Sequence, residues 1–191
     1  MEMNSIAKYI YEMGQLKRVK RSGWWTAGIV NPESIAEHSF RTAVLGYVMA
    51  SLTEADPMKT ATMCLFHDTG EARIGDLHRI ARRYIDVGNG EERAVSEQVE
   101  RLPENAATTI LALFNDYEER ASIEGELARD ADLLECIVQA REYQVQGYAD
   151  TQDWINNCYA GLKTDIAKQL ADACIQVEPN EWWQGLKANR K

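Results

Sequence analysis

Long apolar runs are absent from this chain of 191 residues, and every apolar stretch is far too short to cross a bilayer. No charged segment followed by an apolar one opens the chain, so a secretory signal is not expected. The four cysteines are scattered without a Cys-x-x-Cys pair, which is atypical of zinc knuckles and of disulfide scaffolds. These absences predict a cytoplasmic protein with reduced thiols and no membrane partner.

Positive charge is also scarce, with 21 lysines and arginines against 30 aspartates and glutamates and a net charge of −9. Binding to a nucleic-acid polymer needs a basic surface, so this class of partner is not expected. The exception is residues 17–21, where four of five residues are cationic and two tryptophans follow closely. Most such runs are solvated surface. Next to aromatic side chains, however, this run suits a small phosphorylated ligand with a planar base.

Helical periodicity dominates the rest of the chain. Apolar residues recur at steps of three and four, and no segment shows the sustained alternation of a strand. The sequence therefore predicts an all-α helical bundle that forms a single domain over residues 1–191. We expect its core at about residues 30–145, with further helices at 150–175.

Glycine, proline and capping residues divide the pattern into elements. Residues 15–33 are predicted to be a loop, Ser34 to cap a long helix, and Pro57 to lie in the first turn of the next helix. Gly70 and Gly75 bracket a break after that helix. Later helices are predicted within 94–102, 103–114, 124–147 and, as one or two helices, 154–173. The buried side of the helix after Ser34 is expected to carry Ala36, Phe40, Ala43, Val44, Tyr47 and Val48.

An adjacent histidine and aspartate, His67 and Asp68, close an apolar run in a chain with only three histidines. His38 lies on the helix before this run, and antiparallel packing of the two helices places it opposite His67. Asp132 lies on a long apolar helix further on and is the best candidate for a fourth ligand. Two imidazoles and two carboxylates leave metal coordination positions open, which hydrolytic metal chemistry needs.

Two further acids follow the His-Asp pair. Glu71 lies four residues after His67 and therefore shares its face of a helix, while Asp76 lies just beyond Gly75. Either carboxylate is placed to move protons beside a metal without binding it.

Each of these residues also has an ordinary structural interpretation. A single histidine on an apolar helix is usually a hydrogen-bonded core residue, and a lone Glu71 is usually a surface acid. Asp130 and Asp132 could be solvated or could cap a helix, and His78 is expected in an exposed loop. Burying several carboxylates without a cation costs several kcal/mol per charge, so their occurrence together favours a metal.

The order His, His-Asp, Asp resembles the signature of the HD-domain metal-dependent phosphohydrolases. The sequence around these residues is similar to that of one branch of the superfamily, the small 5′-deoxynucleotidases, over about residues 10–145. The His-Asp pair alone marks the superfamily, whereas the Arg-x-Gly-Trp and Glu-Ser-x-Ala-Glu-His motifs are more specific for this branch. The matching segments are Gln15-Leu16-Lys17-Arg18-Val19-Lys20-Arg21-Ser22-Gly23-Trp24, Pro32-Glu33-Ser34-Ile35-Ala36-Glu37-His38, His67-Asp68-Thr69-Gly70-Glu71 with Gly75-Asp76, and Asp130-Ala131-Asp132-Leu133-Leu134-Glu135 continuing into Gln139-Ala140-Arg141-Glu142-Tyr143.

The resemblance implies an HD-domain bundle that removes the 5′-phosphate from deoxynucleoside monophosphates and assembles as a homodimer. It implies a catalytic role in proton transfer for Glu71 and a place against the substrate for Asp76. Arg21 and Trp24 are expected to bind the phosphate and the nucleotide. The implied cofactor is one divalent transition metal (cobalt, manganese, nickel, iron or zinc), held by His38, His67, Asp68 and Asp132.

Several points stay open at the level of sequence. Some members place the arginine and tryptophan side by side, whereas Ser22 and Gly23 separate them here, so Arg18, Lys20 and Arg21 all stay candidates for the phosphate. The acid lining the pocket from residues 115–120 is either Asp116 or Glu118.

Other functions remain as alternatives to the monophosphatase. The same metal centre suits a hydrolase of nucleoside triphosphates or cyclic nucleotides. A non-catalytic metal- or nucleotide-sensing module and a purely structural bundle are the other readings. The presence of Glu71 and Asp76 beside the metal ligands favours an enzyme.

Overall fold

The structure is a computed structural model that describes residues 3–186. Within this range the chain is built from helices, and its only β-type pairing is one isolated antiparallel bridge between Lys20 and Ser34. The prediction of an all-α fold is confirmed. The α-helices are α1 (Met3–Met13), α2 (Ile35–Ala50), α3 (Pro57–Phe66), α4 (Glu71–Ile74), α5 (Arg79–Arg82), α6 (Gly90–Val99), α7 (Glu104–Glu119), α8 (Ile123–Val145), α9 (Gln152–Gly161) and α10 (Asp165–Gln176), and the short 3₁₀-helices are η1 (Gly14–Lys17), η2 (Ser22–Ala27), η3 (Ala149–Thr151) and η4 (Glu181–Trp183).

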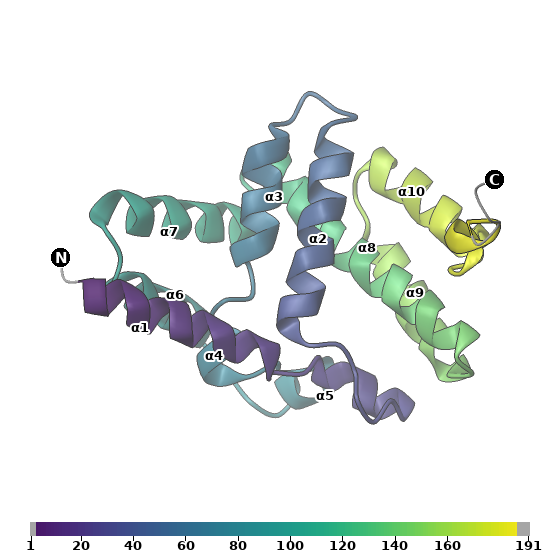
Figure 1. Cartoon of the computed structure of the whole chain (residues 1–191), viewed down its shortest axis with the longest axis horizontal. Coiled ribbons are helices and arrows are strands. Elements are labelled where there is room, and N and C mark those ends of the chain that lie inside the picture. The colour runs from purple at the N-terminus through teal and green to yellow at the C-terminus, as the bar shows by residue number, and fades with distance from the viewer. Residues whose placement is uncertain (1–2, 187–191) are drawn as a thin grey trace.

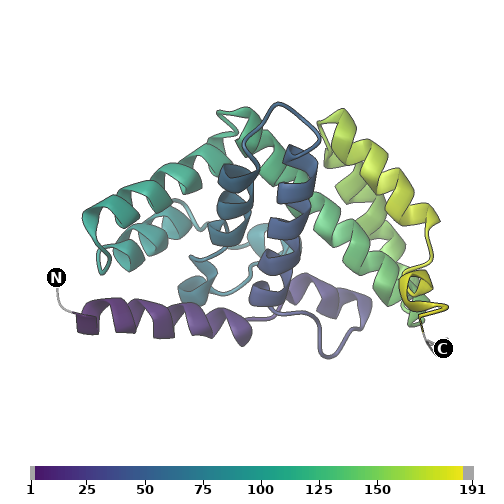
Figure 2. The same ribbon diagram turned by 45° about the horizontal axis from the view of Figure 1, so that its top comes forward.

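Helix α8 lies at the centre of the molecule, behind the antiparallel pair of α2 and α3 (Figure 1). Helices α1, α6 and α7 form a group on one flank, and α9 and α10 form a group on the other flank. A second view shows the same arrangement (Figure 2). The side chains of α8 therefore reach elements on both sides of the fold. The prediction that residues 1–191 form one domain stays a prediction.

The helices that carry the candidate ligands begin at strong capping residues. Ser34 and Glu37 form a capping box, in which the Ser34 side chain accepts from the Glu37 N–H and the Glu37 carboxylate accepts from the Ser34 N–H. Asp56 caps α3 ahead of Pro57, and Ser122 caps α8. These caps confirm the predicted start of α2 and of α3.

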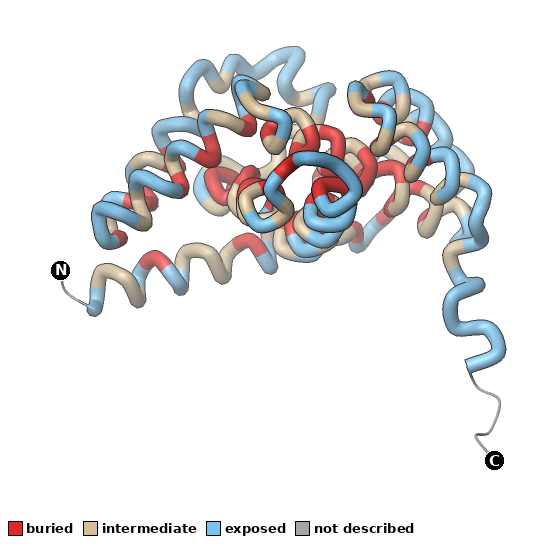
Figure 3. Tube along the Cα trace, turned by 90° about the horizontal axis from the view of Figure 1, so that it is seen from above, coloured by how far each residue is buried: buried red, intermediate tan, exposed pale blue. Residues whose placement is uncertain are grey.

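The buried apolar residues form two clusters. The larger cluster joins α2, α3, α8, α9 and α10, and the smaller one joins α1, α6 and α7 through residues such as Tyr9, Val95 and Phe114. Buried residues are concentrated on the central helices (Figure 3). The candidate ligands thus lie on or next to helices of the larger cluster.

The predicted buried side of α2 is wrong for four of its residues. Phe40, Val44, Tyr47 and Val48 are exposed, whereas the buried face carries polar and small residues that include His38, Thr42 and Gly46. A β-carbon at Gly46 would lie 2.6 Å from the Cys64 sulfur atom, so glycine allows α3 to approach closely. Periodicity failed here because α2 turns polar residues toward α8.

Residues 15–33 are more regular than predicted. They contain η1 and η2, and the Arg21 N–H donates to the Glu33 carbonyl where the segment returns to α2. No helix within residues 3–186 is long and apolar enough to cross a membrane.

Candidate functional site

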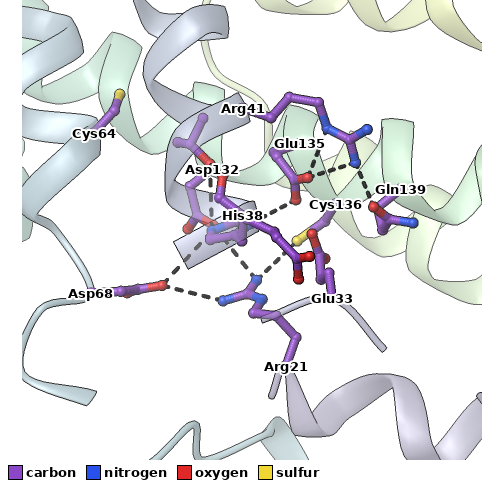
Figure 4. A network of polar contacts seen from close by, with 12 residues as sticks. Arg21, Glu33, His38, Arg41, Cys64, Asp68, Asp132, Glu135, Cys136 and Gln139 are labelled. Carbon is purple, nitrogen blue, oxygen red and sulfur yellow. Dashed lines mark hydrogen bonds and ion pairs between the residues drawn. The ribbon is translucent and has the colours of Figure 1, made fainter. Parts of the chain in front are cut away.

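Four predicted metal ligands meet where α2, the end of α3 and α8 come together. His38 Nε2 lies 3.2 Å from Asp132 Oδ1 and 3.8 Å from Asp68 Oδ2. His67 Nε2 lies 3.1 Å from Asp68 Oδ2 and 4.0 Å from Asp132 Oδ1. Figure 4 shows Asp68 and Asp132 close to His38. The structure therefore brings together all four side chains that the sequence singled out.

Both imidazoles are oriented by contacts at their other ring nitrogen. His38 Nδ1 lies 2.6 Å from Glu135 Oε2, and His67 Nδ1 lies 2.6 Å from the Cys64 carbonyl oxygen. A backbone carbonyl only accepts, so Nδ1 of His67 carries a proton, and Nε2 is the nitrogen whose lone pair can bind a metal. Each ring therefore turns Nε2 toward the two aspartates.

The donor set fits a divalent cation. His67 Nε2 is buried and has no hydrogen-bond partner in the described part of the chain, although the Asp68 carboxylate lies nearby. His38, His67 and Asp68 offer ligand atoms that all lie within 4.8 Å of one another. A buried lone pair without a donor is costly, and nitrogen and carboxylate ligands suit a divalent transition metal.

Charges in the cluster are strongly coupled. Burial lowers the pKa of His38 and so does the Arg21 cation, but the carboxylates of Glu135 and Asp132 outweigh both and raise it to about 10. Burial raises the pKa of Asp68, yet the imidazole of His67 and the cation of Arg21 bring it down to about 2. Asp68 is therefore a carboxylate at neutral pH, as a metal ligand must be.

A cavity of about 460 Å³ lies beside the cluster. Asp68 and Asp132 line it, whereas His38 and His67 lie behind them and do not. The rest of its wall comes from η2, the segment 71–82, α6, α7, α8 and α9. All four remaining predicted site residues also line it, namely Arg21, Trp24, Glu71 and Asp76.

Glu71 and Asp76 are held differently in this cavity. Glu71 is buried, and its Oε2 atom has no hydrogen-bond partner in the described residues. Burial, and then the nearby charges of Asp68 and Asp76, raise the pKa of Glu71 to about 10, so this carboxyl group holds a proton at neutral pH. Asp76 accepts instead from the backbone N–H of Ser22, and the Ser22 hydroxyl donates to the Asp76 carbonyl oxygen.

The backbone at this point depends on two glycines. Gly70 packs against α6, where an added β-carbon would lie 3.3 Å from the Glu91 carbonyl oxygen. Gly75 has φ of 76°, a conformation that side chains other than glycine rarely adopt. The two glycines let the chain turn twice within a few residues and carry both acids to the cavity.

Of the predicted cationic run, only Arg21 lines the cavity. Arg21 lies 3.3 Å from the Asp68 carboxylate and 3.8 Å from that of Asp132. Arg18 donates to the Gln15 side chain, and Lys20 to the Pro32 carbonyl oxygen. Arg21 is therefore the one of the three candidates that reaches the cavity, and its binding of the phosphate stays a prediction.

Trp24 lies deeper than a simple stacking platform. It is 2% exposed, stacks on Trp154 with ring centroids 5.3 Å apart, and donates from Nε1 to Glu33. Its face is thus already covered by another indole, and Trp154 also lines the cavity. The role of Trp24 in substrate binding stays a prediction.

The structure places the other sequence candidates unambiguously. Glu118 lines the cavity, whereas Asp116 does not and pairs with Lys59. His78 is not an exposed loop residue, because it is half-buried, caps α5 and lines the cavity. Asp130 is fully buried and accepts from the backbone of residues 163–164, so its role is structural.

Besides His78, sequence reasoning gave no role to two further residues of this site. Arg129 lines the cavity with its guanidinium 4.6 Å from the centre of the Tyr117 ring, and Glu135 contacts His38. Glu135 lies three residues after Asp132, on the same face of the helix, so its spacing was the signal that could have found it.

Comparison with known proteins identifies the family. A family model described as HD domain matches residues 13–173. The 5′-deoxynucleotidase HDDC2 of Xenopus laevis is 32% identical over 178 residues, which cover 90% of this chain and 87% of that protein. The 5′-deoxynucleotidase hdd1 of Schizosaccharomyces pombe is 31% identical over 197 residues, with 97% and 96% covered.

Solved structures agree with this result. A conserved hypothetical protein from Pyrococcus furiosus has a TM-score of 0.74 and 33% identity, covering 88% of this chain and 96% of that chain. A protein from Pyrococcus horikoshii has a TM-score of 0.70 and 29% identity, covering 88% and 95%. The likeness therefore extends over nearly the whole length of each relative.

Proposed function

Because this chain belongs to the HD-domain family, we propose that it is a metal-dependent 5′-deoxynucleotidase, which hydrolyses deoxynucleoside monophosphates to nucleosides and phosphate. The observation that carries the proposal is the convergence of two imidazoles and two carboxylates beside a cavity that also holds two further acids and an arginine. Relatives that bear the name 5′-deoxynucleotidase and align over most of both chains support the substrate class.

The proposed ligands of one divalent transition metal are His38, His67, Asp68 and Asp132. The buried lone pair of His67 Nε2 supports this assignment, since a cation gives that atom a partner. When bound, the metal supplies Lewis acidity for the phosphoryl group and a nucleophile near neutral pH. Cobalt, manganese, nickel, iron and zinc all suit these ligands.

The other cavity residues bind the substrate and move protons. Arg21 carries a fixed positive charge beside Asp68, and a guanidinium can donate two parallel hydrogen bonds to a phosphate. Glu71, with its protonated carboxyl group facing the cavity, donates a proton to the leaving 5′-oxygen. Asp76, held by Ser22, lies against the substrate and orients it.

The size of the cavity suits a small nucleotide. Its volume of about 460 Å³ lies within the range of about 300–1,000 Å³ typical of small-molecule sites. Asn157, Asp153 and Trp154 of α9 line the part of the wall contributed by that helix, and they offer polar and aromatic groups to a nucleobase.

The proposed assembly is a homodimer, and the proposed location is the cytoplasm. A homodimer is favoured by the exposed apolar stripe of α2, formed by Phe40, Val44, Tyr47 and Val48. The dimer is tested by measuring the molar mass with light scattering during size-exclusion chromatography. The wild type is expected at twice the chain mass, and a Phe40→Ser, Tyr47→Ser double variant at the chain mass. A wild-type monomer would contradict the proposal. The proposed cytoplasmic location suits the four free cysteines.

The function is tested by phosphate release from a panel of deoxy- and ribonucleoside mono- and triphosphates and cyclic nucleotides. We expect release from deoxynucleoside monophosphates that depends on a transition metal. Release confined to triphosphates or cyclic nucleotides would keep the metal site and overturn the substrate. A protein that binds metal and hydrolyses none of these compounds would overturn the enzyme.

A further inference from the structure

Two charged residues follow the candidate ligands by one helical turn. Arg41 lies three residues after His38 on α2, and Glu135 lies three residues after Asp132 on α8. Because α2 and α8 pack side by side, these two residues meet each other and also reach the ligands. They form a layer of charge directly behind the proposed metal centre (Figure 4).

Glu135 contacts both His38 and Arg41. Its Oε2 atom lies 2.6 Å from His38 Nδ1, and its Oε1 atom accepts from Arg41 Nε at 2.9 Å and from a terminal nitrogen of Arg41 at 2.7 Å. Glu135 and His38 are both fully buried. A carboxylate in such a place persists only if it is paired and hydrogen-bonded, as this one is on both oxygens.

Two further residues of α8 hold the Arg41 guanidinium in place. It donates to Gln139 at 2.6 Å and to both carboxylate oxygens of Glu142 at 2.8 and 2.9 Å. Glu135, Gln139 and Glu142 are spaced by four and three residues along one face of α8. The guanidinium is thereby clamped along two turns of α8, and Glu135 has little freedom to rotate away from His38.

The contact determines which nitrogen of His38 faces the metal site. A carboxylate accepts but does not donate, so Nδ1 of His38 carries the proton and Nε2 points toward Asp68 and Asp132. The second imidazole is oriented by a neutral group, the Cys64 carbonyl oxygen. Only one of the two imidazoles is thus backed by a buried charge.

A second metal site at this point is the competing interpretation. His38, Glu135 and Cys136 offer ligand atoms within 4.8 Å of one another. However, both carboxylate oxygens of Glu135 already accept hydrogen bonds, one from His38 and the other from Arg41. The Cys136 sulfur accepts from Arg21 at 3.2 Å. The atoms of this group are engaged with each other and with two cations, which favours an orienting role.

We propose that Glu135 is a positioning residue for the metal centre, holding His38 in the orientation that binds metal, and that Arg41 holds Glu135 in place. The inference rests on the proposed function only through the metal centre, because it requires His38 to be a ligand. Carboxylates that accept from a ligating histidine raise its basicity and fix its ring, and their loss typically costs about 10- to 100-fold in metal affinity.

The test compares Glu135→Gln with Glu142→Gln by chelator competition for cobalt. Both substitutions neutralise an acid of α8 that contacts Arg41, but Glu142 does not contact His38. We expect Glu135→Gln to weaken cobalt binding about 10- to 100-fold and to change the visible absorption of bound cobalt. Glu142→Gln is expected to stay within about twofold of the wild type, since Arg41 keeps Glu135 and Gln139.

Equal cobalt affinities and spectra for wild type and Glu135→Gln would overturn the proposal. It would also be overturned if the wild type bound two metal ions per chain and the variant only one, because Glu135 would then be a ligand of a second metal. A wild type that binds no metal would overturn the metal centre itself, and a wild type that binds metal without releasing phosphate would overturn only the proposed activity. The three failures are therefore distinguishable.

A measurement on the unmodified chain keeps the proposal falsifiable if Glu135→Gln does not fold. The protein has three histidines, so the imidazole nitrogen-15 signals of the zinc-loaded wild type are few and assignable. We expect His38 to show a protonated Nδ1 and a metal-bound Nε2. Metal bound to Nδ1 of His38 would contradict the orientation that Glu135 is proposed to impose.

Discussion

The two sides of the cavity are built differently. On one side, α2 and α8 carry His38 and Asp132 within long, regular helices, and Glu135 behind them is fully buried. On the other side, residues 67–82 follow the end of α3 as a turn, two four-residue helices and the backbone turn at Gly75. We call these the α2–α8 wall and the 67–82 wall.

The α2–α8 wall orients a ligand, whereas the 67–82 wall carries the atoms proposed to react. The α2–α8 wall surrounds its ligand His38 with charged partners, Glu135 and Arg41, so this ligand is held before any metal arrives. The 67–82 wall instead carries two buried atoms with no hydrogen-bond partner among the described residues, Glu71 Oε2 and His67 Nε2, the second of which faces the Asp68 carboxylate. Unpaired polar atoms are costly for stability, and here they lie where metal and substrate are proposed to bind.

The largest expected effect is loss of a ligand from either wall. His38→Ala and His67→Ala should each lower kcat/KM by about 10³-fold or more, because a metal contributes several kcal/mol to the transition state. The walls should differ in metal-free stability. His38→Ala leaves the buried charge of Glu135 short of a partner and should cost about 3 kcal/mol, whereas His67→Ala leaves only the neutral Cys64 carbonyl without its donor and should cost less. Urea unfolding of the stripped proteins measures this, and equal losses would contradict the comparison.

Glu71→Gln tests the reactive side alone. Removing a positioned proton donor should lower kcat by about 10²- to 10⁴-fold. Metal affinity should hardly change, because Glu71 is not among the proposed ligands. Phosphate release at saturating metal, with metal binding measured in parallel, checks this. A variant that keeps full kcat would remove Glu71 from the mechanism.

Glu33 lies next to the α2–α8 wall, where it accepts from Trp24 Nε1 of η2 and its N–H donates to the Tyr143 hydroxyl of α8. Burial and the charge of Glu135 raise the pKa of Glu33 to about 7, against an ordinary value of 4.5. Its stabilising contribution is therefore complete below about pH 4.5 and is lost as the pH rises through about 7.

Glu33→Gln should abolish that pH dependence. Relative to this variant, the wild type should lose about 3 kcal/mol of unfolding free energy between pH 4.5 and 8, since each pKa unit corresponds to about 1.4 kcal/mol. Denaturant unfolding of both proteins across this pH range measures it. Parallel stability curves would show that Glu33 is ionised in the folded protein.

The smallest expected effect concerns two acids of α7. Glu118 lines the cavity and Asp116 faces Lys59, so Glu118→Gln should change KM by about 2- to 10-fold, the size of one polar contact. Asp116→Asn should leave KM within about twofold. Steady-state kinetics of the two variants measure both KM values. A larger effect from Asp116→Asn would show that Asp116, and not Glu118, is the acid that contacts the substrate.

The 67–82 wall also shows what the sequence could predict. His67, Asp68 and Glu71 are close in sequence, so their spacing alone indicates a shared site. His38 and Asp132 were found because each lies on a strongly apolar helix. The His78 contact was missed because short capped turns leave no periodic signal.

The errors on α2 have a physical cause. Its buried face mixes polar residues (His38, Ser39 and Thr42) with apolar ones at its two ends, and a rule that apolar residues face inward then selects the wrong side. Partners such as Arg41 and Glu135 come from different helices, so their contact depends on how α2 and α8 pack. Sequence periodicity predicts each helix but not the register between them.

The most direct test of the central claim is a titration of metal-stripped protein with cobalt, following phosphate release from a deoxynucleoside monophosphate. The account predicts no release without metal and activity that rises linearly to a maximum at one equivalent per chain. Full activity in the stripped protein, or bound cobalt that produces no release, would contradict it.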